Sequence, residues 1–262
     1  MKSKFSILLV VILILISITS CSNNKSSSKQ KNSISTTSNI NLSTNNTTPS
    51  STTITSTSSN NNNENSNLSS NTENNTAINQ YKAILENKTA FFSTDNKKNR
   101  YLNDFLANNG IYSTTLTISH FTVLDMDSDG IPEVVLELSV SDSPQFYEVL
   151  HYMNGKVFGY LKTYRSLEML KTDGTFISSG GALDNEYGTL LFNTSTSNIN
   201  VLGDMQSKQS TTGTTVSYFI NNKSVTKENF DSFAQKQDEK KDATWYDFTK
   251  NNIMNLENLI SN

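Results

Sequence analysis

Cysteine, histidine and proline are scarce in this 262-residue chain, and each scarcity excludes a class of structure. A single Cys rules out a disulfide framework and any CxxC zinc or redox site. The 2 His residues are too few for a multi-histidine metal centre, and 3 Pro with 10 Gly exclude a collagen-like or proline-rich fibre. The formal net charge of -3 gives no positive field that would attract phosphate backbones. We therefore expect no nucleic-acid partner.

The N-terminus carries the pattern of a secretory signal peptide. Lys2 and Lys4 precede an apolar run from Phe5 to Ile16, which matches the charged and hydrophobic parts of such a signal. The run is short for a membrane span, because a transmembrane helix needs about 20 apolar residues. We expect residues 1–20 to be cleaved off as a signal peptide.

The single cysteine, Cys21, follows Ile18, Thr19 and Ser20. This order of an aliphatic residue, two small residues and Cys resembles the lipobox of bacterial lipoproteins. The resemblance implies that the Cys21 sulfur carries diacylglycerol, that cleavage falls before Cys21, and that acyl chains such as palmitate hold the protein on the outer face of the cell membrane. Each buried CH₂ contributes about 0.8 kcal/mol, so two or more chains give a stable anchor. A free core thiol and an uncleaved membrane anchor are the alternatives.

Residues 21–76 consist almost entirely of Ser, Thr and Asn, and no aromatic residue occurs between Phe5 and Tyr81. Such a segment cannot bury enough apolar surface to offset its chain entropy, so we expect a disordered linker. As a flexible coil of about 55 residues it would span on the order of 40 Å. A passive spacer, an O-glycosylated segment and an aggregation-prone segment fit this composition alike.

Composition changes at Ala77, and residues 77–262 are long enough for one globular domain. Apolar residues at near-helical spacing predict two N-terminal helices, over 78–92 and 101–106. Two apolar stripes, over 230–234 and 245–260, predict helices at the C-terminal end.

Between these helices the pattern changes to strands. Asn154-Gly155 lies between two β-rich runs and predicts a tight hairpin. The turns between strands are short, so we expect an antiparallel meandering sheet and an α+β domain. The predicted strands are 121–124, 134–140, 146–153, 156–164, 175–178, 187–193 and 215–221.

One segment carries a pattern of metal ligands. In the sequence from Asp125 to Glu133, carboxylates occupy loop positions 1, 3, 5 and 9, and Gly130 occupies position 6. Oxygen donors at these positions are what a hard cation such as Ca²⁺ requires, and the glycine permits a sharp turn. An acidic turn that joins two strands without a metal is the alternative.

This motif resembles the D-x-D-x-D-G-x-x-[DE] calcium loops of FG-GAP and related modules, and the stretch 121–138 is similar to surface lipoproteins of low-GC Gram-positive, clostridial-type bacteria. The resemblance implies a calcium site in which side chains and one backbone carbonyl are the ligands. Position 12 is Leu136 where an EF-hand has Glu, so we expect weak binding with a dissociation constant of about 10⁻⁴ to 10⁻³ M. The expected ligands are Asp125, Asp127, Asp129, the carbonyl of Ile131, and Glu133.

Catalytic candidates are few. His120 and His151 could each act as a general base, but both lie in strand-like runs that favour a surface or satisfied core histidine. Ser178 to Gly181 lacks a nucleophile-elbow pattern and is expected to be a loop. We therefore assign no catalytic residue and leave the question of catalysis open.

The sequence favours a lipid-anchored extracytoplasmic protein that binds an unidentified envelope protein or polymer, with a structural calcium loop. The alternatives are an envelope hydrolase that acts on cell-wall or peptide substrates and a small-solute receptor.

Overall fold

A computed structural model describes residues 63–110 and 113–261, with side chains described from Thr72 onward. The predicted signal peptide, the lipidation site Cys21 and most of the predicted linker lie outside the described residues. No helix in the described part of the chain is long and apolar enough to cross a membrane.

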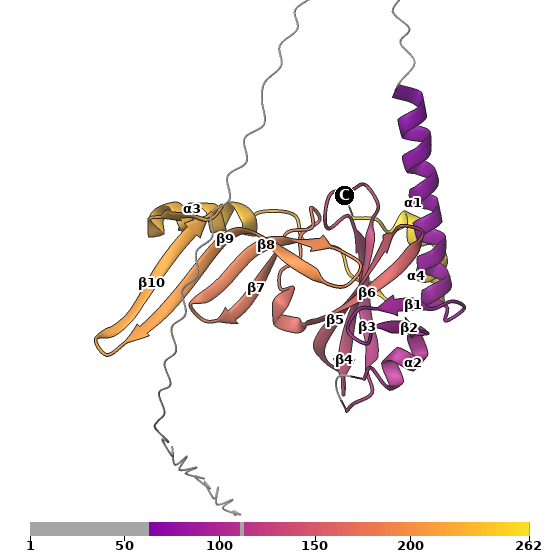
Figure 1. Cartoon of the computed structure of the whole chain (residues 1–262), viewed down its shortest axis with the longest axis horizontal. Coiled ribbons are helices and arrows are strands. Elements are labelled where there is room, and N and C mark those ends of the chain that lie inside the picture. The colour runs from indigo at the N-terminus through magenta and orange to yellow at the C-terminus, as the bar shows by residue number, and fades with distance from the viewer. Residues whose placement is uncertain (1–62, 111–112, 262) are drawn as a thin grey trace, which may run out of the picture. The chain divides into compact units, whose positions relative to one another are not determined.

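Two sheets form the body of the domain (Figure 1). The first has seven strands, and all its neighbours pair antiparallel except β1 and β6, which pair parallel. Its strands, in spatial order, are β12 (Tyr246–Asp247), β3 (Thr117–Leu124), β4 (Glu133–Val140), β5 (Ser143–Met153), β6 (Lys156–Thr163), β1 (Phe91–Ser93) and β2 (Lys98–Arg100).

The second sheet has five strands, and all its neighbours pair antiparallel. Helix α3 packs on it through aromatic rings, with Phe230 against Tyr218 and Phe233 against Tyr187. The strands, in spatial order, are β11 (Lys223–Val225), β10 (Gly213–Ile220), β9 (Ser197–Ser210), β8 (Asp184–Phe192) and β7 (Phe176–Gly181).

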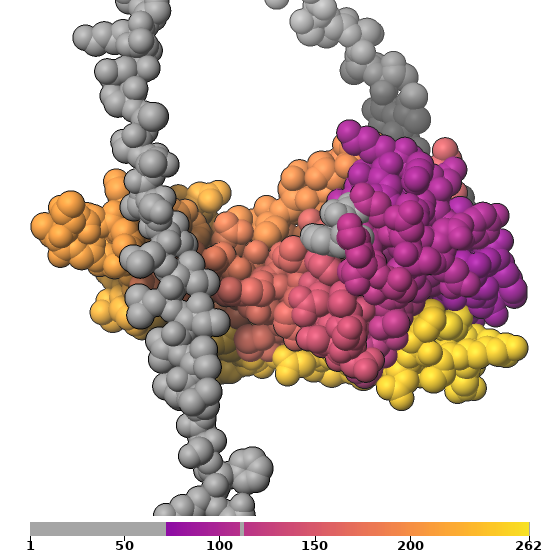
Figure 2. Space-filling model, turned by 90° about the horizontal axis from the view of Figure 1, so that it is seen from below, coloured from indigo at the N-terminus to yellow at the C-terminus, as the bar shows by residue number. Residues whose placement is uncertain are grey.

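Helices lie toward both ends of the described chain. The C-terminal segment (yellow) lies beside the first part of the domain (indigo to magenta) in Figure 2, and Lys82 forms an ion pair with Glu257 there. The helices are α1 (Asn63–Leu85), α2 (Leu102–Ala107), α3 (Lys227–Asp238) and α4 (Lys250–Met254), with 3₁₀ turns η1 (Tyr164–Ser166) and η2 (Leu256–Asn258).

The central strands of the first sheet are buried on both faces because their alternate residues enter two different cores. In β4, Val134, Leu136 and Leu138 pack with α1, α2 and α4, whereas Val135 packs with Phe176 of the second sheet. Two-sided burial explains why β4 is almost continuously apolar.

The predicted α+β class is confirmed, and so is the hairpin at Asn154-Gly155, where both residues have positive φ (54° and 77°) and Met153 pairs with Lys156. The expectation of one sheet is wrong, since β7 to β11 form a second sheet. The strand β9 was not predicted.

Two predicted helices are partly wrong. Phe91 and Phe92 belong to strand β1, where Phe92 pairs with Phe158 of β6. Trp245 is half-buried against the inter-sheet core and is followed by the short strand β12, so the expected long C-terminal helix is reduced to α4 and η2. Helix α1 begins at Asn63, inside the predicted linker, but its buried side chains start at Ala77, where the composition changes.

A buried carboxyl group lies in the core between the first sheet and helices α1, α2 and α4. Glu148 of β5 is fully buried, and neither of its oxygens has a hydrogen-bond partner within the described residues. A Cβ atom at Gly159 would lie 2.2 Å from Glu148 Oε1, so the glycine leaves the space that the carboxyl group fills. Burial raises the pKa of Glu148 well above its ordinary value of 4.5.

We predict that Glu148→Met stabilises the protein at pH 7 by about 1–3 kcal/mol, the cost of an unpaired buried polar group. Because the folded-state pKa is raised, this carboxyl favours folding most below pH 4.5, and stability falls as the pH rises from there toward the raised pKa. Glu148→Gln should remove this pH slope while it keeps an unpaired polar group. Urea unfolding at several pH values measures both effects, and a Glu148→Met protein less stable than wild type at pH 7 would contradict the prediction.

Candidate metal centre

The acidic loop joins β3 to β4, and the sheet holds its two ends together. Leu124 and Glu133 are paired neighbours across the two strands. Ser128 and Gly130 have positive φ angles of 64° and 88°, so the chain reverses between them. The sharp turn expected at Gly130 is therefore present.

One apolar side chain on each side of the sheet fixes the loop. Met126 is fully buried in the core between the two sheets, and Ile131 packs against the core beneath α1. The loop backbone is thus tied to both cores, which leaves the Asp side chains between these two anchors available for the site.

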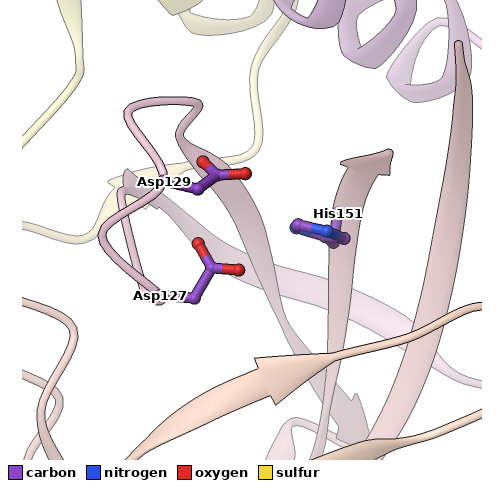
Figure 3. Close-up of side chains that lie close together, drawn as sticks. All are labelled: Asp127, Asp129 and His151. Atoms are coloured by element: carbon purple, nitrogen blue, oxygen red, sulfur yellow. The ribbon is translucent and has the colours of Figure 1, made fainter. Parts of the chain in front are cut away.

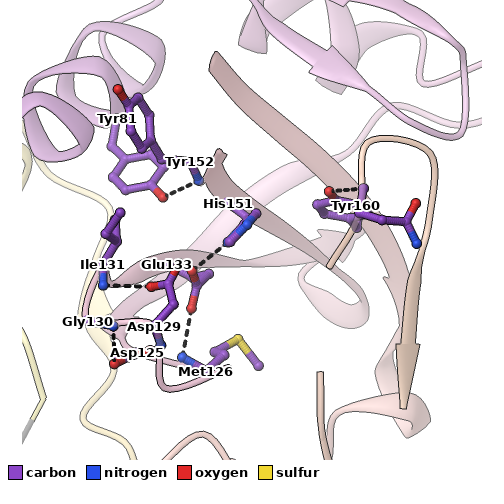
Figure 4. Close-up of polar contacts among 11 residues, drawn as sticks. Tyr81, Asp125, Met126, Asp129, Gly130, Ile131, Glu133, His151, Tyr152 and Tyr160 are labelled. Atoms are coloured by element: carbon purple, nitrogen blue, oxygen red, sulfur yellow. Dashed lines mark hydrogen bonds and ion pairs between the residues drawn. The ribbon is translucent and has the colours of Figure 1, made fainter. Parts of the chain in front are cut away.

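Carboxylates of the loop accept hydrogen bonds from its own backbone (Figure 4). Asp125 accepts from the N–H groups of Asp129 and Gly130 at 3.2 and 3.0 Å, and Asp129 accepts from Ile131 N–H at 2.7 Å. These contacts hold the turn in shape and still leave carboxylate lone pairs for an ion. The role of the Ile131 carbonyl as a ligand stays a prediction.

The predicted carboxylates are positioned where a metal ion could bind. One ligand atom each of Asp125, Asp127 and Glu133 lie within 4.8 Å of one another. A second group with the same spacing contains Asp127, Asp129 and His151 (Figure 3). Asp127 belongs to both groups, and its Oδ1 atom is buried with no hydrogen-bond partner in the described structure.

Glu133 connects the loop to strand β5. Its side chain is fully buried; Oε2 accepts a hydrogen bond from Met126 N–H at 2.7 Å, and Oε1 lies 2.7 Å from His151 Nδ1. Figure 4 shows Glu133 between the loop and the histidine. Glu133 therefore fixes the loop relative to His151. It also lies near enough to Asp125 and Asp127 to contribute an oxygen ligand to a metal ion.

The loop carries an electrostatic penalty. Burial, followed by the charges of Asp129 and Asp125, raises the pKa of Asp127 to about 6. Burial also raises the pKa of Glu133 well above its ordinary range, and the charge of Asp127 adds to this shift. A divalent cation among these groups would offset both the repulsion between the carboxylates and the cost of burying their charges.

His151 is the residue of this site that sequence reasoning did not place. Its side chain is almost fully buried, its ring stacks on Phe192 with centroids 4.2 Å apart, and burial lowers its pKa to about 4. The ring is therefore neutral at pH 7, with one nitrogen carrying a proton and the other a lone pair.

The other candidates lie outside this site. His120 is half-exposed, and its Nδ1 atom is 3.0 Å from Glu137 Oε1. Ser178 to Gly181, expected to be a loop, instead belongs to strand β7, where Ser179 donates a hydrogen bond to Glu168. Neither arrangement joins a serine hydroxyl to a histidine base.

Gly174 is a further residue on which the loop geometry depends. It lies in the turn before β7 with a φ of +78°, and a Cβ atom there would be 2.6 Å from Met126 Cα and 2.7 Å from the Met126 carbonyl oxygen. Only glycine allows the turn to approach the loop this closely. Gly174 lies far from the loop in the sequence, so the sequence alone gives no sign of this role.

No protein-family model matches the chain, and neither curated proteins nor solved structures give a match. The site is therefore interpreted from its own geometry, and the similarity to clostridial-type lipoproteins and FG-GAP loops stays a prediction.

We predict that Gly174→Ala displaces Met126 and weakens the affinity of the loop for divalent cations. The positive φ alone costs on the order of 1–2 kcal/mol of stability. Gly155→Ala is a matched control, because Gly155 has a φ of +77° and no atom within 4 Å of the added Cβ. Urea unfolding and calorimetric titration with Ca²⁺ should show lower stability in both variants but weaker binding only in Gly174→Ala. Equal affinities in the two variants would contradict the role of Gly174.

Proposed function

We propose that this chain is a lipid-anchored extracytoplasmic binding protein in which Ca²⁺ fixes the β3–β4 loop. The observation that carries the calcium part is the convergence of Asp125, Asp127 and Glu133, with ligand atoms within 4.8 Å of one another. These are oxygen donors, which suit a hard cation. Without a cation, three acid groups at this spacing repel one another.

A structural role for the ion follows from the position of the loop. Glu133 is the first residue of β4, and Met126 and Ile131 join the two cores. An ion bound between them would stabilise the end of the β3–β4 hairpin, and with it the contact between the sheets. The loop with its bound ion would then stabilise the folded domain.

A cleft elsewhere supports binding over hydrolysis. It has a volume of about 700 Å³, within the range of ligand sites. The described residues that line it include aromatic, amide and hydroxyl side chains and Lys156, but no His, Asp or Glu that could act as a general base. A second, smaller cleft contains Asp184, Glu186 and Asp204 but no histidine.

The membrane anchor rests on the sequence alone. The lipobox-like order that ends at Cys21 would place the folded domain outside the cytoplasm, at the end of a polar linker. Calcium is abundant in such a compartment relative to the weak affinity expected, so the loop could stay occupied there. The partner would be an envelope protein or polymer bound by the folded domain.

We predict that Ca²⁺ raises the melting temperature of the wild-type protein and gives a measurable heat of binding. With a dissociation constant of about 10⁻⁴ to 10⁻³ M, 10 mM Ca²⁺ should stabilise the fold by about 1.4–2.7 kcal/mol. Asp127→Asn should abolish the effect, and Asp142→Asn, in the exposed β4–β5 turn, is the matched control.

Protons compete with the ion, because the pKa of Asp127 is raised to about 6. The calcium-induced rise in melting temperature should therefore be smaller at pH 5 than at pH 7.5. No heat and no shift at either pH would sink the calcium proposal.

We predict that Cys21→Ser blocks processing of the precursor or releases the protein from the membrane, because the acylated sulfur would be lost. Fractionation of cells followed by mass spectrometry of the N-terminus measures both outcomes. Normal cleavage with unchanged membrane retention would show that Cys21 is not the anchor.

A further inference from the structure

We propose that the acidic loop and strand β5 together form a metal subsite for a transition ion such as Zn²⁺, with Asp127, Asp129 and His151 as ligands and Glu133 as the positioning residue. The ligand atoms of the three residues lie within 4.8 Å of one another. This inference extends the proposed function, because Asp127 is shared with the calcium group, but the ligand sets otherwise differ.

The nitrogen donor decides the class of metal. Ca²⁺ is bound by oxygen ligands, whereas imidazole suits Zn²⁺ and neighbouring first-row ions. His151 comes from β5 and not from the loop, so it adds a donor type that the linear motif lacks. Two carboxylates and one imidazole are three protein ligands, which leaves a fourth position of a tetrahedral ion open.

The surroundings of His151 are those of a metal-binding histidine. Its Nδ1 atom lies 2.7 Å from Oε1 of Glu133, which is fully buried. A ligating histidine commonly donates one ring N–H to a carboxylate, which fixes the tautomer and leaves the other nitrogen as the ligand. Stacking on Phe192 restricts rotation of the ring, with an angle of 13° between the ring planes. His151 is therefore held in one orientation before any ion arrives.

One oxygen of half-buried Asp127 is available as a ligand. Its Oδ1 atom is buried and has no hydrogen-bond partner in the described structure. Buried polar oxygens normally have a partner, and a metal ion held by the three ligands would supply one for Asp127. Asp129 is exposed, so an ion can reach the site from solvent.

Imidazole NMR of the wild-type chain tests the subsite without any mutation. The chain has 2 His, so ¹⁵N-histidine labelling of protein purified without a polyhistidine tag gives two ring systems. Addition of one equivalent of Zn²⁺ should shift the ring nitrogens of His151 and leave those of half-exposed His120 unchanged. No shift at His151, or equal shifts at both residues, would overturn the proposal.

Two variants separate this subsite from the calcium group. His151→Gln should weaken Zn²⁺ binding by about tenfold or more and lower the affinity for Ca²⁺ much less, because the Gln amide can still donate a hydrogen bond to Glu133. Asp125→Asn should lower the affinity for Ca²⁺ more than that for Zn²⁺, because Asp125 belongs to the calcium group and not to the His151 group. His120→Gln is the matched control, and circular dichroism shows whether each variant folds. Wild-type Zn²⁺ affinity in a folded His151→Gln protein would contradict the proposal. A wild-type protein that shows no calcium response but keeps the His151 shift with Zn²⁺ would overturn only the calcium proposal.

Discussion

The contact between Glu133 and His151 is the interaction on which the site depends. A carboxyl group and an imidazole ring, both almost fully buried, meet at 2.7 Å, and the other carboxyl oxygen accepts from the Met126 backbone. Leaving either group buried without its partner would cost more than the pair contributes. The pair therefore holds three segments in register: the acidic loop, the start of β4, and the end of β5.

The arrangement concentrates negative charge at one end of a sheet that is buried on both faces. Met126 and Ile131 keep the loop backbone in place, which holds the residues that carry the carboxylates close together. Helix α1 closes the other face, where the Tyr81 hydroxyl accepts a hydrogen bond from Tyr152 N–H at 2.7 Å. The charge of Glu133 contributes to the raised pKa of Tyr81, after burial. A bound cation would thus affect packing on both sides of the first sheet.

Sequence reasoning succeeded where the signal is local. The convergence of the loop carboxylates, the Asn154-Gly155 hairpin and helix α3 each depend on residues close together in the chain, and the sequence predicts each of them. It failed where pairing with a distant strand decides the structure, as when β6 draws Phe92 into a strand. Strand β9 is largely polar, and the alternation of Ile199, Val201 and Met205 along it is a weak signal that was missed. His151 lies 18 residues from Glu133, and the antiparallel pairing of β4 with β5, in which Val134 is opposite Leu150, brings the two together.

The most direct test of the central claim, that this loop binds a divalent cation, is to locate the ion itself. Mn²⁺ accepts both carboxylate and imidazole ligands and gives an anomalous X-ray signal, so a crystal grown with Mn²⁺ would show its position. We expect an anomalous peak within coordination distance of Asp127 and at least two other residues of the loop or His151. A well-ordered loop without a peak, or with its carboxylates turned away from one another, would contradict this account.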